Sequence, residues 1–257
     1  MSESTAKNKE SLLRMLGWMW GFLCLLLVSM GAWLGLAWAP PEKYMGEVQR
    51  IMYIHVPFVQ VALLMVLANF VACLGYLFSG KWLFDALAQA TVEMALLFGS
   101  VGVVLGAVWG KPTWGVFWTW DPRLTASAVL LIVYYGYWAL RKFTEEPERR
   151  ARWSSVVGIL AAVNAPIVYF SVHWWNSLHQ QSTTRVDIDG AMRFVWHYNS
   201  VAFVCTAAFF VTVRTQLALR QRSQEVAMPP PAPNLPASTP SATPSALPSP
   251  PSHPEAP

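Results

Sequence analysis

The sequence predicts an all-α protein: a polytopic membrane helical bundle with six transmembrane helices and both termini in the cytoplasm. Three observations support this fold class. Hydrophobic residues make up 54% of the 257-residue chain and charged residues only 12%, about half the charged fraction of a soluble domain. Several mostly apolar runs have the length of roughly 20 residues that crosses a bilayer. Lysine and arginine, finally, are divided unequally between the segments that connect these runs.

The elements follow in order. Polar residues 1–14 form a cytoplasmic N-terminus, and the first apolar run covers 15–38. Its end, Ala37-Trp38-Ala39, resembles a signal-peptide cleavage site. The run is longer than the roughly 7–15 residues of a signal-peptide core, and Pro40 would follow the cleaved bond, so we expect an uncleaved anchor. Further spans are predicted at 53–78, 91–109, 126–140, 154–174 and 199–217.

The positive charges predict the orientation of these spans. With the N-terminus inside, the inner segments hold twelve of the 18 lysines and arginines and the outer segments hold six. Cytoplasmic segments carry such an excess, and an odd number of spans would place one terminus on the wrong side. The six spans form one membrane domain, 15–225, and the Pro-rich segment 226–257 is predicted to be a disordered cytoplasmic tail.

The composition argues against several function classes. No basic run is interleaved with exposed aromatic residues, so the net charge of +4 does not indicate nucleic-acid binding. The chain has no P-loop and is not expected to hydrolyse ATP by itself. Cys24, Cys73 and Cys205 lie far apart in apolar runs without a CxxC motif, which argues against thiol–disulfide exchange and structural zinc.

The connection at about 110–125 is rich in tryptophan. Residues 109–125 read WGKPTWGVFWTWDPRLT and contain Trp109, Trp114, Trp118 and Trp120. Trp114 and Trp118 share one face whether the segment is helical or extended. A wide aromatic surface suits a flat aromatic ligand, at about 0.5–1.5 kcal/mol per ring contact beyond area burial. Tryptophan also favours the membrane interface, so a ligand platform and an interfacial belt remain equal alternatives for this segment alone.

Histidines flank the tryptophan segment on the outward face. His55, in YIHVP, lies where the second span begins, and His179, in WWNSLHQ, follows the fifth span. Two imidazoles beside an aromatic surface resemble the axial ligand pair of haem iron. His173 and His197 lie at similar depth and compete for this role, whereas His253 falls in the predicted tail.

Positively charged residues near the same surface are suited to pair with the two propionates of a haem. Arginine pairs well with carboxylates such as haem propionates, and Arg123 is the strongest candidate because it lies inside the tryptophan segment. Asp121 has three candidate roles: capping the helix that starts near Pro122, orienting a ligand histidine, or pairing with Arg123. Asp85 and Glu93 lie towards the inner face and are expected to be structural. The other candidate partners of the propionates are Arg50, Lys111 and Arg185.

The segment from Trp114 to Asp121 fits the WGxxWxWD signature of the WWD haem-handling proteins of c-type cytochrome biogenesis. With six spans, YIHVP before the second and WWNSLHQ after the fifth, residues 12–220 resemble the cytochrome c maturation protein C (CcmC) family. The resemblance implies two haem ligands, His55 and His179, with His173 and His197 as neighbours only. It implies a haem platform formed by Trp114, Gly115, Trp118, Trp120 and Asp121.

The implied function is haem export or delivery without enzymatic activity. The family binds haem b (iron protoporphyrin IX) transiently at the periplasmic face of the bacterial inner membrane. The implied partners, besides the lipid bilayer, are the membrane-anchored haem chaperone CcmE, the small subunit CcmD and the ABC transporter CcmA/CcmB.

Three alternatives remain open. A transmembrane haem transporter would need a polar path, and Asn69 and Asn164 with Pro166 are its only mid-span candidates, although helix packing suits them better. A haem lyase, like the larger proteins that bear the same signature, would attach haem to apocytochrome. An electron-transfer cytochrome b would need histidine pairs inside the helices.

Overall fold

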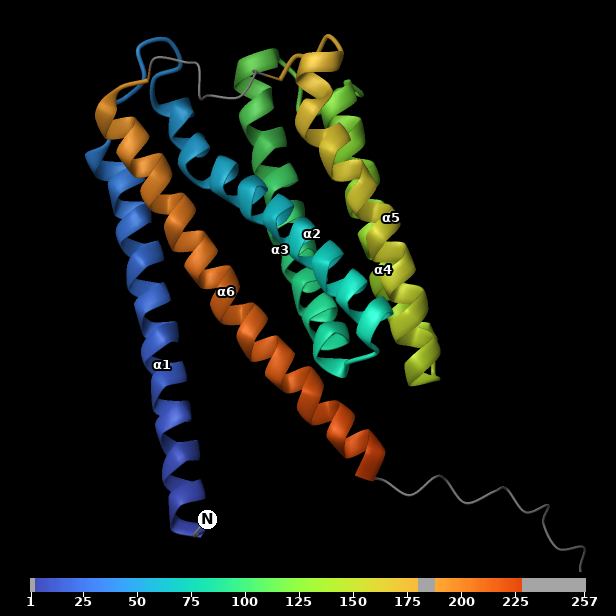
Figure 1. Cartoon of the computed structure of the whole chain (residues 1–257). Coiled ribbons are helices and arrows are strands. Elements are labelled where there is room, and N and C mark those ends of the chain that lie inside the picture. The colour runs from blue at the N-terminus through green and yellow to red at the C-terminus, as the bar shows by residue number, and fades with distance from the viewer. Residues whose placement is uncertain (1–2, 180–187, 228–257) are drawn as a thin grey trace, which may run out of the picture.

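The computed structural model describes residues 3–179 and 188–227 (Figure 1). Within these residues all regular secondary structure is helical, and six helices are long and apolar enough to cross a membrane. The predicted all-α, six-span fold is confirmed. Both Glu3 and Ala227 lie at the same end of the bundle, as an even number of spans requires. Arg185, His253 and nearly all of the predicted Pro-rich tail lie outside the described residues.

The helices alternate in direction along the chain. A short π-helix, Leu34–Trp38, continues the first of them, and a 3-10 turn, Glu47–Ile51, leads into the second. Residues 39–46, 115–121 and 175–179 therefore lie together at one end of the bundle, which we call the site end. The helices are α1 (Glu3–Trp33), α2 (Met52–Ser79), α3 (Trp82–Trp114), α4 (Pro122–Phe143), α5 (Pro147–Trp174) and α6 (Gly190–Ala227).

Several helices extend beyond their predicted spans because apolar runs mark only the part of a helix that faces lipid. The predicted connection at 79–90 is a tight turn in which Gly80 has φ = 64°, a left-handed conformation that glycine adopts readily. α3 therefore begins at Trp82. It also continues to Trp114, so only residues 115–121 of the tryptophan segment lie outside helices.

The bundle is built around α2, which packs against α3, α5 and α6, while α4 packs on α5 and α1 on α6. Asn69 is fully buried at the centre, where its amide donates to the Ala88 carbonyl at 2.8 Å and accepts from the Tyr134 hydroxyl at 3.4 Å. Asn164 donates to the Ala126 carbonyl at 2.8 Å. Both mid-span asparagines therefore join helices, as expected.

Two ion pairs join α3 to its neighbours towards the other end of the bundle. The Arg141 guanidinium donates to both carboxylate oxygens of Asp85, at 2.6 and 3.0 Å. Arg214 of α6 pairs in the same two-pronged way with Glu93. Both acidic residues therefore have the structural role that the sequence predicts.

Candidate functional site

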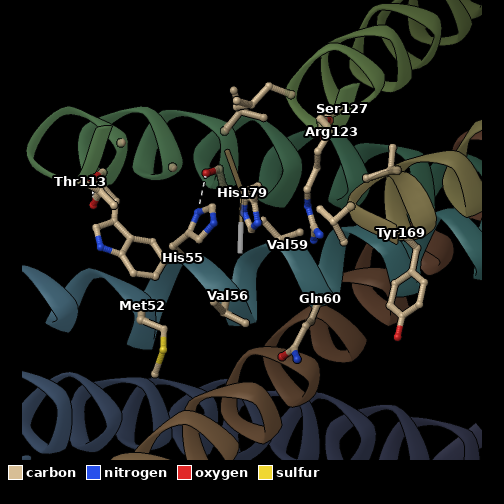
Figure 2. Close-up of a pocket in the computed structure, with 18 of the residues that line it drawn as sticks. Met52, His55, Val56, Val59, Gln60, Thr113, Arg123, Ser127, Tyr169 and His179 are labelled. Atoms are coloured by element: carbon tan, nitrogen blue, oxygen red, sulfur yellow. Dashed lines mark hydrogen bonds between the residues drawn. The ribbon is translucent and has the colours of Figure 1, made fainter. Parts of the chain in front are cut away.

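A cavity opens at the site end between α2, α3, α4 and α5, with one wall residue from α6 (Figure 2). Its volume is about 200 Å³, many times the space that one water molecule needs. Four of the predicted site residues contribute to its wall, namely His55, Trp114, Arg123 and His179. Segments far apart in the chain thus bring two imidazoles, an indole and a guanidinium to one space.

His55 is held rigidly in α2. Its side chain is buried, its Nδ1 lies 2.9 Å from the Gly102 carbonyl oxygen, and its ring meets Trp109 edge-on at 5.7 Å. A carbonyl oxygen can only accept, so Nδ1 carries the proton and donates it. This tautomer leaves the lone pair of Nε2 for a metal, the arrangement found in metal-binding histidines whose other nitrogen is hydrogen-bonded.

A glycine face on α3 makes room for that imidazole. Gly102, Gly106 and Gly110 line the cavity at four-residue spacing, which places them on one side of the helix. A Cβ atom on Gly106 would lie 2.8 Å from His55 Cε1, closer than two carbon atoms can approach without a shift. This face was not among the features predicted from the sequence, although glycines repeated at four-residue spacing indicate a close approach to the helix backbone.

Replacing Gly106 by Ala is therefore expected to displace His55 and to lower the ligand content of the purified protein. The new methyl group collides with the ring carbon beside Nε2, and overpacking of this kind costs about 1–3 kcal/mol. With haem as the ligand that the family resemblance implies, the measurement is the absorption spectrum and haem content after purification. Gly136→Ala in α4 is the matched control, because nothing lies within 4 Å of its added Cβ. Equal haem content in both variants would contradict this account.

Asp121 connects α4 to the segment that carries His179. It is the N-cap residue of α4, where Oδ1 accepts from the Leu124 N–H at 2.8 Å. Oδ2 accepts from the Ser177 hydroxyl and from the Leu178 N–H at 3.2 Å. The Ser177 oxygen in turn accepts from the His179 N–H at 3.1 Å. The predicted capping role is confirmed, and the same carboxylate positions the histidine segment.

The imidazole of His179 reaches the cavity beside Trp114. The two ring centroids lie 6.1 Å apart, and the ring planes are tilted by 59°. His55 comes from α2 and His179 from the connection after α5, so the two imidazoles belong to separate elements. Figure 2 shows both rings facing the same space.

Arg123 extends from the first turn of α4 into the cavity, towards Val59 and Tyr169 (Figure 2). Within residues 3–179 and 188–227, no hydrogen bond or ion pair of its guanidinium is found, including with Asp121. A partly buried guanidinium that forms no ion pair within the described residues favours an anionic ligand.

Two other candidate cations, Arg50 and Lys111, donate hydrogen bonds to backbone carbonyls. Arg50 donates to the Gly35 and Ala39 carbonyls, at 2.7 and 2.9 Å. Lys111 donates to the Gly115 carbonyl at 2.9 Å. Neither residue lines the cavity. Of the described candidates, Arg123 is thus the one that the fold places to meet a ligand carboxylate.

The other residues of the predicted platform do not line the cavity, namely Gly115, Trp118, Trp120 and Asp121. Trp118 and Trp120 pack edge to face at 5.6 Å, and Trp120 is 77% exposed. Gly115 ends α3 with φ = 81°, so its role is to allow the left-handed turn. Of the predicted platform residues, Trp114 lines the cavity, and Trp109, five residues earlier in α3, lines it as well.

The two competing histidines are placed differently. His173 lines the cavity near its exposed rim. His197 does not line it, and its Nδ1 donates to the Arg193 carbonyl at 2.7 Å.

Comparison with known proteins relates the chain to a family. The sequence model of the CcmC family, described as Heme exporter protein C, matches residues 3–228. Heme exporter protein C of Escherichia coli K12 is 33% identical over 77% of this chain and 76% of its own length. The Bradyrhizobium diazoefficiens protein of the same name is 35% identical over 66% of this chain and 64% of its own length. A putative ccmC-like mitochondrial protein for cytochrome c biosynthesis in Marchantia polymorpha is 32% identical over 76% and 85%.

Proposed function

Because the chain belongs to the Heme exporter protein C (CcmC) family, we propose that it binds haem in the cavity at the site end and delivers it to a haem chaperone. The family handles haem for c-type cytochrome biogenesis. One observation carries the proposal: His55 and His179, from separate elements, line a single cavity together with Arg123, which forms no ion pair within the described residues. These are the groups that the iron and a propionate of haem require.

The cavity walls fit the rest of a haem molecule. Haem b is a flat, largely apolar ring that carries two carboxylates and an iron able to take two axial nitrogen ligands. Trp109 and Trp114 offer aromatic surface near the two imidazoles. The cavity therefore offers imidazoles for the iron, a guanidinium for a propionate and aromatic surface for the macrocycle.

The two histidines differ in a way that suits transient binding. His55 is buried within α2 and is fixed by the Gly102 carbonyl. His179 follows the end of α5 and depends on Ser177 and Asp121 for its position. We infer that His55 holds the iron throughout and that movement of the 175–179 segment withdraws His179. Withdrawal exposes one iron site to a ligand of the accepting chaperone.

The proposal extends to location and partners. The excess of lysine and arginine in the segments at the other end supports a cytoplasmic location for that end, so the site faces the periplasm from the bacterial inner membrane. The proposed acceptor is the chaperone CcmE, and the proposed complex includes CcmD and the ABC transporter CcmA/CcmB. This chain itself acts as a binding and delivery protein rather than as an enzyme.

Transport of haem through the bundle is a weaker candidate. Asn69 and Asn164, the polar residues that such a path would use, are engaged in hydrogen bonds between helices. A haem-lyase role is tested separately by assaying thioether formation with an apocytochrome, and the delivery proposal expects none.

Substitution of the two histidines tests the proposed function. Wild-type protein purified from haem-supplied membranes is expected to show a low-spin, six-coordinate haem spectrum. His179→Ala should lose one axial ligand and become high-spin, and the double variant with His55→Ala should retain little or no haem. His197→Ala is the matched control, since this histidine is at the same end but does not line the cavity. A double variant with unchanged haem content and spectrum would refute the axial assignment.

A further inference from the structure

The cavity extends well below the two histidines. Along α2 its wall continues from His55 through Val59 and Gln60 to Leu63, about two helical turns or ~12 Å along the helix axis. From α5 it includes Val168 and Tyr169. The site therefore enters the membrane-spanning part of the bundle rather than ending at its surface.

This lower part is open at the side. Gln60 and Tyr169 line the cavity and are also exposed on the outside of the bundle, Tyr169 by 49%. α2 packs against both α5 and α6 and lies between them in Figure 1. Residues that belong to both the inner wall and the outer surface mark an interruption of the wall. We call this opening, framed by Gln60 and Tyr169, the side portal.

The portal is polar although it lies within the membrane span. The Gln60 side-chain amide is hydrogen-bonded to the Ser200 hydroxyl of α6 at 2.8 Å and retains at least one N–H for a ligand. The Tyr169 hydroxyl and the Arg123 guanidinium lie on the same side of the cavity (Figure 2). Polar groups that face lipid are costly. An amide N–H, a phenol and a guanidinium all donate, so the set suits a carboxylate.

We propose that haem enters the cavity sideways from the leaflet at the site end, through the portal between α2 and α5. The propionates then contact Gln60 and Tyr169 before Arg123, while the opposite edge of the ring moves towards Trp109 and the histidines. This inference rests on the proposed haem function and adds the route and two further residues that bind the propionates.

Loading kinetics test the portal. Full-length apo-protein in lipid nanodiscs is mixed with liposomes that contain haemin, and the rise of the Soret band gives the loading rate. The double variant Gln60→Leu/Tyr169→Leu is expected to load about tenfold more slowly, the loss of roughly one hydrogen bond to a charged group. Tyr135→Leu is the matched control, because Tyr135 is 50% exposed on α4 and its hydroxyl pairs with Ser100 instead. This control should load at the wild-type rate.

A second probe tests the role of the carboxylates. Iron protoporphyrin IX dimethyl ester lacks free propionates and is expected to load into wild-type protein at the slow rate of the double variant. It should show no further slowing in that variant. Equal haemin rates for wild type and the double variant would overturn the portal. If wild-type protein took up no haemin at all, the proposed function itself would fail.

Accessibility of the portal gives an independent measurement. A Gln60→Cys variant should react with a membrane-permeant maleimide in the apo-protein and be protected at least several-fold once haem is bound. Wild-type protein supplies the background, because Cys24 and Cys73 are buried and Cys205 is half-buried. Equal labelling with and without haem would contradict entry at this position.

Discussion

Replacing Asp121 by Asn is expected to lower haem affinity about 10- to 100-fold, the usual effect of losing a group that positions a metal ligand, while the bundle stays folded. Asparagine caps helices as well as aspartate does, so its single oxygen can still accept from the Leu124 N–H. Its amide nitrogen then faces the Leu178 N–H, a group that donates a hydrogen bond to the carboxylate in the native protein. Two donors cannot pair, so the Leu178 N–H loses its acceptor and the Ser177 hydroxyl loses the carboxylate to which it donates, which weakens the anchor of the segment that carries His179.

Two further variants separate the two roles of this carboxylate. Ser177→Ala removes the hydroxyl that links Asp121 to the His179 backbone and should weaken haem binding in the same direction, by a smaller factor. Asp121→Ala removes the cap as well, at about 1 kcal/mol of additional folding free energy. The measurements are haem titration and thermal unfolding of the purified proteins. If Asp121→Asn bound haem like wild type, the positioning role would be refuted.

The elements that the sequence predicts well are those that follow from local chemistry. Long apolar runs identify all six helices, and the aspartate before Pro122 identifies the start of α4. The YIHVP and WWNSLHQ motifs identify the histidines that meet at the cavity. In each case a few neighbouring residues are enough for the prediction, through the length of an apolar run, a helix-capping residue or a short motif.

The parts that the sequence predicts poorly depend on contacts between distant segments. Trp114, Trp118 and Trp120 belong to the same sequence motif, yet α3 ends at Trp114. Of these three, only Trp114 therefore reaches the cavity wall. The bond between Asp121 and Ser177 joins residues 56 positions apart. Gln60 is one polar residue in an apolar run, and its place at an opening depends on how α5 and α6 pack on α2.

The second large effect is expected at the opposite end of the bundle, in the pair between Asp85 and Arg141. Their side chains are only 11% and 9% exposed, and Arg141 also donates to Gln89 at 3.1 Å. Arg141→Met leaves the Asp85 carboxylate buried without its partner, which costs about 3–5 kcal/mol. The measurement is the free energy of unfolding in mixed micelles.

The double variant Asp85→Leu/Arg141→Met distinguishes a stabilising pair from a buried charge that merely needs a partner. Replacing both ions by apolar groups is often neutral for stability or stabilises the protein by about 1–4 kcal/mol. The free energy of unfolding of this double variant should therefore lie near the wild-type value, despite the large loss in the single variant. Arg149→Met is the matched control, because Arg149 and its partner Glu146 are 66% and 60% exposed, and exposed pairs contribute about 0–1 kcal/mol. A double variant as unstable as Arg141→Met would show instead that the pair contributes net stability to the packing of α4 on α3. The haem spectrum should not change in either case, because neither residue lines the cavity.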